Sequence, residues 1–300
     1  MTSAELPRVA SVVIVSHNEG ASLHRTVDAI LGTLTPHSEV IVVDDSSTDG
    51  SADFLASGYR GVRLVRPAER LGALRARNCG GALASRPLIV FADAHVAPSP
   101  GWVDQLAAAL SEPDVAAVGP GVSVMGRPGT TAYGHVWKDP ALSWRWLSKQ
   151  GDRPYEVPML PGCFYGLRRE VFERTGGFDD GLLIWGTGDS ELSLRLWLLG
   201  YRCLVVPAVD VAHQFKKAHN FPLDWELLLH NMLRSATVHL NQARLTQVVA
   251  AMSHRRAFPP AFARLLLSDA WERRDRLRAL RTRDDDWFFD HFGLEWSNGG

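Results

Sequence analysis

Acidic residues and histidines directly follow several short apolar runs of the sequence, where they could bind a metal ion or a phosphate group. Asp93 ends the apolar run of residues 88–92, and His95 comes two residues later. Side chains two residues apart in an extended segment point the same way, so Asp93 and His95 could hold one ion together. Taken alone, the pair also fits a turn in which Asp93 caps the backbone and His95 is simply exposed.

The ligand types indicate which ion such a site would hold. A divalent cation that binds a nucleotide diphosphate needs hard oxygen ligands and open coordination positions. An imidazole ligand favours Mn²⁺ over Mg²⁺, so we expect Mn²⁺, with Mg²⁺ as the alternative. The three cysteines, Cys79, Cys163 and Cys203, occur at no metal-binding spacing, and their odd number predicts no disulfide framework.

The composition bounds the class of protein. The 300 residues are 46% hydrophobic and 22% charged, as expected for a soluble globular chain with a large core. The net charge of −1 favours neither a nucleic acid nor an anionic membrane as a partner. The sequence has no run of about 18 apolar residues and no signal-peptide pattern. Together with the cysteines, these features predict a cytoplasmic protein without a membrane span.

Strand and helix patterns alternate along the first half of the chain. The strand-like runs are short and β-branched, which is typical of strands buried on both faces. The runs between them carry apolar residues at helical spacing. This order predicts an α/β fold with a mostly parallel, doubly wound sheet that binds ligands at the carboxyl ends of its strands. The predicted elements are strands at residues 11–16, 39–45, 62–67 and 87–93, and helices at residues 21–34 and 73–85.

The second half of the chain has a different texture. An aromatic, proline-punctuated stretch at residues 133–160 has the composition of a binding surface more than of a regular scaffold. An amphipathic helix is predicted at residues 190–200. A pair of strands is predicted at residues 202–213 and ends near His213. After residue 221 the pattern is helical to the end.

Two common nucleotide-binding signatures are missing from the first strand–helix turn. A dinucleotide-binding fold needs a G-x-G-x-x-G turn there, but residues 16–20 read SHNEG. No P-loop occurs either, so NAD enzymes and P-loop NTPases are disfavoured. A nucleotidyltransferase also uses an acidic metal site, but it would need a Gly-rich, basic signature in the same turn.

Six motifs occur in one order across residues 10–221. They are SVVIVSHNEG…EVIVVDDSS, RLGALRARNCGGALA, FADAH, GWVDQL, MLPGCFYGLRREVFERTGGFDDGLLIWGTGDSELSLRLW and VDVAHQFKKAHNF. With these motifs the chain resembles family-2-type nucleotide-sugar glycosyltransferases of the GT-A fold, and more specifically the catalytic domain of the polypeptide N-acetylgalactosaminyltransferases. That branch carries Asp-x-His in place of Asp-x-Asp, as Asp93 and His95 do.

The resemblance implies a domain division and roles for individual residues. A GT-A catalytic domain is expected at residues 1–221, with a nucleotide-binding half at about 10–112 and an acceptor half at about 113–221, before a helical region at 222–300. The expected metal ligands are Asp93, His95 and His213. The residues expected around a UDP-sugar donor are His17, Glu19, Asp44 or Asp45, and Arg70.

The roles expected of other residues near these motifs are less specific. Arg75 and Arg77 could contact a phosphate, a pocket carboxylate or a structural partner. Residues 216–221 resemble a lid over the diphosphate, in which Lys216 and His219 would stabilise the charge of the leaving group. A solvated basic turn is the alternative reading of that segment.

The chain departs from the family in the loop of residues 185–191, which reads WGTGDSE. The family pattern is Trp-Gly-Gly-Glu-Asn-x-Glu, so Gly188 stands at the position of the first glutamate. Asp189 stands at the Asn position, where inverting family-2 enzymes carry the aspartate that acts as general base. We therefore expect Asp189 to deprotonate the acceptor, with Trp185 and Glu191 in the same catalytic loop.

Several alternatives stay open at this point. The other carboxylates that could act as base are Asp179, Asp180 and Glu191, although Glu191 could instead belong to a cap at the helix start. The stereochemistry of transfer is open as well. Because Gly188 replaces a glutamate, a non-catalytic relative that binds a nucleotide-sugar or glycan is the main alternative to an enzyme.

The helical region resembles the helical extensions of some bacterial family-2 enzymes rather than the lectin-like β-trefoil of the N-acetylgalactosaminyltransferases. His230, Asn231 and Arg234 share one helix face by spacing, and they could border the acceptor cleft or form a structural polar face. The predicted function is transfer of a hexose or N-acetylhexosamine from a UDP-sugar to a peptide, natural-product or glycan acceptor.

Overall fold

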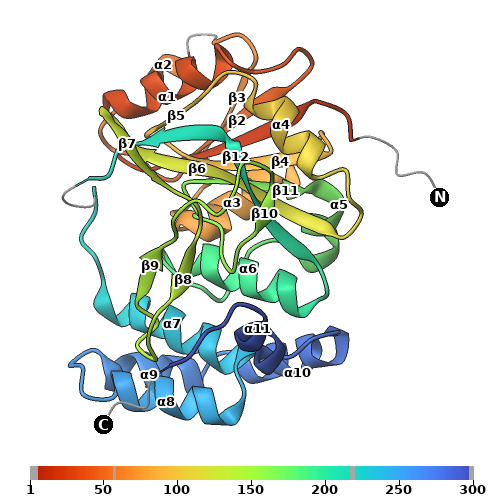
Figure 1. Ribbon diagram of the computed structural model, residues 1–300. Helices are drawn as coiled ribbons and strands as arrows, with labels where there is room; N and C mark the ends of the chain where they lie inside the picture. The colour runs from red at the N-terminus through yellow and green to blue at the C-terminus, as the bar shows by residue number, and fades with distance from the viewer. Residues whose placement is uncertain (1–5, 57–58, 217–219, 297–300) are drawn as a thin grey trace.

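The computed structural model describes residues 6–56, 59–216 and 220–296. Within these residues, a mixed ten-stranded sheet forms the upper part of the molecule in Figure 1, and a layer of C-terminal helices lies below it. The strands are β1 (Ala10–Ser16), β2 (Glu39–Asp44), β3 (Val62–Val65), β4 (Leu88–Asp93), β5 (Val96–Pro98), β6 (Val115–Val124), β7 (Arg127–Ala132), β10 (Tyr155–Glu156), β11 (Phe164–Arg168) and β12 (Arg202–His213), and a separate hairpin joins β8 (His135–Trp137) to β9 (Trp144–Trp146).

The helices divide into those that flank the sheet and those that follow it. The first group is α1 (Ala21–Leu31), α2 (Asp53–Ala56), α3 (Ala73–Ala82), α4 (Trp102–Ala109), α5 (Arg169–Thr175) and α6 (Gly188–Leu198). The second group is α7 (Trp225–His239), α8 (Gln242–Met252), α9 (Phe258–Leu266), α10 (Ala270–Leu280) and α11 (Asp285–His291). The predicted helical character of the region after residue 221 is therefore confirmed.

The strand order is β10-β12-β6-β11-β4-β1-β2-β3. The first half of the chain forms parallel strands as predicted, because β3, β2, β1 and β4 all run the same way. β11 runs antiparallel to both β4 and β6, and β12 is parallel to β6. Because β11 is antiparallel to both of its neighbours, β6 and β12 run parallel to β4. The carboxyl ends of β1, β2, β4 and β12 therefore meet at one edge of the sheet.

The first strands are buried on both faces, as their β-branched sequences indicate. In β1, Val13 packs into the hydrophobic cluster on one face of the sheet, while Val12 and Ile14 pack into the cluster on the other. This alternation follows from the two-residue period of a strand. Because a shift of one residue would turn every side chain to the other face, this alternation also fixes the register of each strand. The register in turn determines which residues lie at the sheet edge.

β12 corrects one expectation. Residues 202–213 were predicted as a pair of strands, but they form a single strand whose register against β6 shifts between Val206 and Asp210. Pro207 lies within this irregular stretch, and proline cannot donate a ladder hydrogen bond. The shift lets the strand continue, and it carries His213 back to the edge reached by β4.

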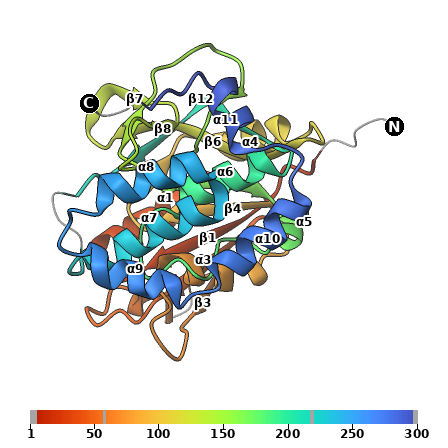
Figure 2. The same cartoon turned by 90° about the horizontal axis from the view of Figure 1, so that it is seen from below.

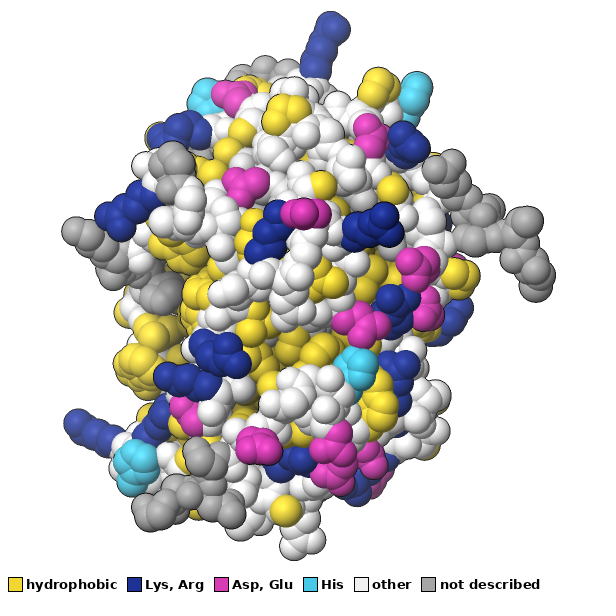
Figure 3. Space-filling model, viewed as in Figure 1, with side chains coloured by type: hydrophobic (Ala, Val, Ile, Leu, Met, Phe, Trp, Pro, Cys, Tyr) yellow, Lys and Arg dark blue, Asp and Glu magenta, His cyan; other side chains and the backbone are white. Residues whose placement is uncertain are grey.

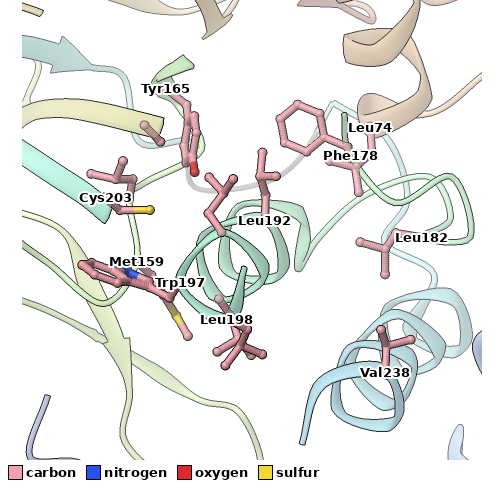
Figure 4. Packing of buried hydrophobic residues seen from close by; sticks show 14 of the residues in the cluster. Leu74, Met159, Tyr165, Phe178, Leu182, Leu192, Trp197, Leu198, Cys203 and Val238 are labelled. Carbon is pink, nitrogen blue, oxygen red and sulfur yellow. The ribbon is translucent and has the colours of Figure 1, made fainter. Parts of the chain in front are cut away.

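α6 corrects another expectation, because it is buried on every side rather than amphipathic. All of its residues except Asp189 are buried. Figure 4 shows it surrounded by apolar side chains from the strands on one side, such as Tyr165, and from α7 on the other, such as Val238. A helix enclosed on all sides must pair its own charged residues internally.

The C-terminal helices pack onto the rest of the molecule through one continuous apolar cluster. Figure 2, seen from below, shows α7 to α10 lying across the molecule. The same cluster of buried residues includes Val13 and Phe91 of the sheet and Leu233 and Phe288 of the helices. Among the described residues, no helix is long and apolar enough to cross a membrane.

Candidate active site

A cavity of about 750 Å³ opens at the edge of the sheet where the parallel strands end. Its walls include His17 after β1, Asp45 after β2, Asp93 at the end of β4 and His213 at the end of β12. This is the place at which open α/β sheets bind their ligands. The volume lies in the range typical of small-molecule and cofactor sites.

Three of these residues form a group that could hold a metal ion. Asp93, His95 and His213 each offer one ligand atom, and the three atoms lie within 4.8 Å of one another. Oδ2 of Asp93 is 3.9 Å from Nε2 of His95 and 3.5 Å from Nε2 of His213. One carboxylate and two imidazoles suit Mn²⁺ better than Mg²⁺.

His213 provides a test of whether a cation fits. Its side chain is buried, and neither ring nitrogen has a hydrogen-bond partner among the described residues. A buried, unpaired imidazole nitrogen is unfavourable unless something binds it. The nearest carboxylate oxygen, on Asp93, is beyond good hydrogen-bond geometry. A cation between them would satisfy both groups, so the residues present fit the metal.

Neighbouring charges orient the three ligands. Arg77 donates to Oδ1 of Asp93 at 2.9 Å, which leaves Oδ2 facing the histidines. Burial raises the pKa of Asp93, but its contacts with His213 and Arg77 outweigh this and hold the pKa well below the ordinary range. Glu19 accepts from Nδ1 of His95 at 3.1 Å, so Nε2 is the nitrogen available to a metal. Outer carboxylates commonly orient metal-binding histidines in this way.

Glu19 lines the cavity, and its carboxylate contacts both a candidate metal ligand and a candidate lid residue. Its carboxylate accepts from His95 and from Nζ of Lys216 at 2.5 Å. Burial raises the pKa of Glu19, and the hydrogen bonds from His95 and Lys216 lower it by more. Lys216 therefore lies at the cavity wall beside the candidate metal ligands. His219, the other expected lid residue, lies outside the described residues.

The structure separates the two aspartates that the sequence left as alternatives. Asp45 lines the cavity, and its carboxylate accepts from the backbone amides of Leu71 at 2.6 Å and Gly72 at 2.9 Å. Asp44 is buried outside the cavity and pairs with Arg66 at 3.0 Å. Asp44 is therefore not in contact with the donor space, because adjacent residues at the end of β2 point to opposite sides.

His17 and Arg70 both line the cavity. The ring nitrogen Nδ1 of His17 is 2.7 Å from the carbonyl oxygen of Asp45. The guanidinium of Arg70 is 5.5 Å from the ring centroid of Phe221, which also makes an edge contact with His17. These contacts bring the loops after β1, β2, β3 and β12 together at the cavity.

The loop of residues 185–191 reaches the cavity from the opposite side. Trp185 and Asp189 both line it. Oδ2 of Asp189 accepts from the backbone amide of Gly162 at 3.0 Å, and Oδ1 accepts from that of Ser190 at 2.9 Å. Because Arg77 also donates to the carbonyl of Gly162 at 2.8 Å, a short hydrogen-bonded chain links Asp93 to Asp189.

Gly188 is required by packing at this point. A Cβ atom added there would lie 2.2 Å from Cδ2 of Leu74, which is itself buried. No side chain, and certainly no glutamate, fits at position 188 while Leu74 keeps its place. The glycine that departs from the family pattern therefore leaves the space that Leu74 of α3 occupies.

Glu191 does not reach the cavity, which corrects its assignment to the catalytic group. It is fully buried and binds Nε of Arg195 at 2.9 Å and Nε2 of His239 at 2.9 Å. Arg281 donates to Nδ1 of His239, so the imidazole is neutral and donates to the carboxylate. Burial raises the pKa of Glu191, and the charge of Arg195 with the bond from His239 lowers it well below its usual range. Its role is structural rather than a helix cap.

The other carboxylates considered as a base are also engaged elsewhere. Asp179 is buried against Arg234, which donates to both its oxygens at 2.8 and 2.9 Å. Asp180 accepts from Nδ2 of Asn78 at 2.7 Å. Neither lines the cavity, so Asp189 is the aspartate of this group that does.

The polar face of α7 holds the start of the loop that carries Trp185 and Asp189. Asn231 accepts from the amide of Leu183 and donates to the carbonyls of Leu183 and Trp185, at 2.7, 2.8 and 3.0 Å. His230 contacts the carbonyl of Gly181 at 3.2 Å, next to the Arg234–Asp179 pair. Of the two roles considered, a border of the acceptor cleft or a structural polar face, these contacts support the structural one for His230, Asn231 and Arg234.

The aromatic wall of the cavity was indicated only by composition. It lies between the sheet and the C-terminal helices, where hydrophobic side chains gather in Figure 3. Trp144 and Trp225 are 53% and 61% exposed there. The lining residues that the sequence did not single out individually include His135, Trp137, Trp144, Trp146, Phe215, Trp225, Leu228, Met232 and Arg255. The three from α7 could not be foreseen, because their helix spacing is that of ordinary core residues.

Comparison with known proteins places the chain among glycosyltransferases. Residues 11–176 match the model of glycosyl transferase family 2, and residues 147–220 match a model described as the N-terminal domain of galactosyltransferase. Polypeptide N-acetylgalactosaminyltransferase 8 of Drosophila melanogaster is 30% identical over 98% of this chain and 52% of its own length. Polypeptide N-acetylgalactosaminyltransferase 13 of Homo sapiens is 34% identical over 73% of this chain and 44% of its own. The chain thus spans about half the length of these relatives.

Solved structures show the same fold. A crystal structure of GalNAc-T7 with UDP, GalNAc and Mn²⁺ has a TM-score of 0.79 at 24% identity, and the match covers 95% of this chain and 56% of that one. A mannosyltransferase from Pyrobaculum calidifontis in complex with GDP-Man and Mn²⁺ has a TM-score of 0.52 at 24% identity, over 90% of this chain and 74% of that one. The predicted GT-A fold is confirmed. Because 95% of the chain is covered, the likeness to GalNAc-T7 includes most of the helical region that we expected to depart from that family.

The match to the family model extends over more than half of the chain, and the sheet edge carries the motifs that led to the predicted resemblance. The protein belongs to glycosyl transferase family 2.

Proposed function

We propose that the protein is a metal-dependent glycosyltransferase that moves a sugar from a UDP-linked donor to a hydroxyl acceptor. The observation that carries this proposal is the group of Asp93, His95 and His213, with the buried ring nitrogens of His213 unpaired at the floor of the cavity. A nucleotide diphosphate needs a cation at such a position. The matched GalNAc-T7 structure, which holds UDP, GalNAc and Mn²⁺, supports the choice of UDP and Mn²⁺.

Residues of the donor end would bind the nucleotide and its phosphates. Arg70 and Lys216 line this end and bring positive charge towards the diphosphate space. Asp45 and His17 would contact the base or ribose. When bound, the cation supplies positive charge for the developing diphosphate. Lys216 adds a point charge beside it, which stabilises the leaving group in the transition state.

Asp189 would be the general base on the acceptor. It lines the cavity between the metal group and the aromatic wall, and its carboxylate is held by two backbone amides. Leu74 fills the space that a glutamate at position 188 would need. We propose that the hydroxyl activated by Asp189 displaces the diphosphate directly, which inverts the anomeric configuration.

The acceptor would bind against the aromatic wall. Trp144 and Trp146 of the hairpin and Trp225 of α7 present flat apolar surfaces beside Asp189. The helical region therefore belongs to the same functional unit as residues 1–221, because α7 supplies part of this wall and also holds the catalytic loop. Peptide, natural-product and glycan hydroxyls are the acceptor classes to be compared.

The first test measures UDP and GDP release from a panel of sugar donors with Mn²⁺, Mg²⁺ or EDTA. We expect UDP release that needs the metal and is lost in Asp93→Ala. Asp290→Ala, an exposed carboxylate on α11, is the matched control and should keep wild-type rates. Full activity in EDTA would refute the metal-dependent reading. UDP binding without release from any donor would favour a binding protein instead.

The second test concerns the base. Asp189→Asn keeps the shape of the side chain, so we expect kcat to fall by about 10²–10⁴ while UDP affinity is unchanged. Asp180→Asn, outside the cavity, is the control. Unchanged turnover at saturating acceptor would eliminate Asp189 as base, and an α-linked product from an α-linked donor, read by NMR, would eliminate inversion.

A cytoplasmic location is part of the proposal. Cys79, Cys163 and Cys203 are all unpaired, and the last two are buried. Free thiols of this kind are usual in a reducing compartment.

A further inference from the structure

His135 is a buried histidine at the wall of the cavity whose role the proposed function leaves open. It lies on β8, and its backbone is held on both sides, by pairing with Trp146 of β9 and by a hydrogen bond from its amide to the carbonyl of Met159 at 3.0 Å. The rings of Trp144 and Trp146 make edge contacts with the imidazole at 5.9 and 6.1 Å. The ring therefore has little freedom to turn away from the loop that it faces.

The imidazole points at the catalytic loop. Its Nε2 atom is 3.1 Å from the hydroxyl of Ser190 and 4.0 Å from Oδ2 of Asp189. The side chain is only 5% exposed, and burial lowers its pKa although the charge of Asp189 raises it. A neutral imidazole in this position can accept a proton.

Asp189 needs such a neighbour. Two backbone amides donate to its carboxylate, one to each oxygen. Once it has taken a proton, Asp189 loses part of these hydrogen bonds. A group that accepts the proton next would restore the ionised carboxylate without access to bulk water.

We propose that His135 is the proton-accepting partner of Asp189 in acceptor activation, an inference that rests on the proposed glycosyl transfer. The acceptor oxygen bonds to the anomeric carbon as its O–H bond breaks, and its proton goes to Oδ2 of Asp189. The bond from the anomeric carbon to the diphosphate breaks, and its electron pair leaves with the diphosphate. The proton then passes from Oδ2 to Nε2 of His135, while the Ser190 hydroxyl turns from donating to Nε2 to accepting from it.

The experiment is a double-mutant cycle on the transfer reaction. We expect His135→Ala to lower kcat by about 10–100-fold with the KM for the donor and the affinity for UDP with Mn²⁺ unchanged. Because His135 acts through Asp189, adding His135→Ala to Asp189→Asn should cause no further loss. Multiplied losses in the double variant would overturn the inference.

Two further variants separate proton transfer from simple packing. His135→Gln can still hydrogen-bond Ser190 but cannot accept a proton, so it should be as slow as His135→Ala; a wild-type rate in this variant would overturn the inference. His37→Gln, on the surface, is the matched control. Thermal unfolding of each variant checks that the fold is kept.

A readout that needs no activity comes from NMR. The ¹⁵N shifts of the His135 ring should differ between wild type and Asp189→Asn, because removing the carboxylate charge changes the proton distribution on the imidazole. Identical shifts would count against proton transfer between Asp189 and His135. A wild type that binds UDP but transfers nothing would refute the proposed function, whereas a wild type that transfers and tolerates His135→Ala would refute this inference alone.

Discussion

The packing of Gly188 against Leu74 makes a quantitative prediction about the one position that breaks the family pattern. In Gly188→Ala the new methyl carbon would lie 2.2 Å from Cδ2 and 2.7 Å from Cδ1 of Leu74, and both atoms belong to a buried side chain. Inserting a methyl group into a packed core costs about 1–3 kcal/mol. The better helix propensity of alanine, ~1 kcal/mol, offsets part of this cost. Contacts as short as 2.2 Å place the packing cost at its upper end, so we expect a net loss of roughly 2 kcal/mol in the free energy of unfolding.

The partner variant shows whether Leu74 is the cause. Leu74→Ala alone should cost about 2–5 kcal/mol because it leaves a cavity. In the double variant the new methyl group enters that cavity, so the loss should be no larger than that of Leu74→Ala. The expected coupling is therefore about 1–3 kcal/mol, the size found for residues in direct contact.

Chemical denaturation measures these differences, and thermal unfolding checks them at about 2–4 °C per kcal/mol. Gly293→Ala, a glycine with no atom near its missing Cβ but with a positive φ, is a control for backbone strain without packing. Gly188→Glu should be less stable still and should gain no activity. A stable Gly188→Ala protein, or losses that simply add in the double variant, would refute the packing argument.

Three other predictions concern His239, Asn231 and His213. Burial lowers the pKa of His239 to about 4, against 6.5 in the unfolded chain, so the unfolded chain binds more protons between these values. Stability should then fall as the pH drops from about 6.5 towards 4, by ~2 kcal/mol at pH 5, and His239→Gln should reduce this dependence in pH-dependent unfolding. Asn231→Leu should lower kcat more than UDP affinity, because it frees the backbone of the loop that carries Trp185; equal losses in both would contradict a positioning role. His213→Gln should weaken UDP binding in calorimetry with Mn²⁺ but not without metal, and the same loss in EDTA would argue against a ligand role.

Local sequence already determined much of this protein. The two-residue and helical periods predicted the alternating elements of the first half, because strands buried on both faces must be apolar throughout. Asp93 and His95 lie at and just after the end of one of those strands, and the direction of parallel strands brings them to the same edge as the residues after β1 and β2. His213 joins them only because β11 reverses the chain direction twice, so that β12 runs parallel to β4.

Tertiary structure decided the assignments that depend on which way a side chain faces. Asp44 and Asp45 are neighbours of the same type, and only the pleat of β2 sends one to the cavity and the other to Arg66. Glu191 belonged to a loop that matched a catalytic pattern, yet enclosure of α6 between the sheet and the C-terminal helices buries it with Arg195 and His239.

The remaining features arise from segments far apart in the chain. His135 reaches Ser190 and Asp189 only because the hairpin of β8 and β9 folds over α6. Gly188 faces Leu74 across more than a hundred residues of sequence. Residue types and spacing determine which chemistry is available, and long-range packing determines which of those side chains share one cavity, because contact between distant segments leaves no periodic signal in either of them.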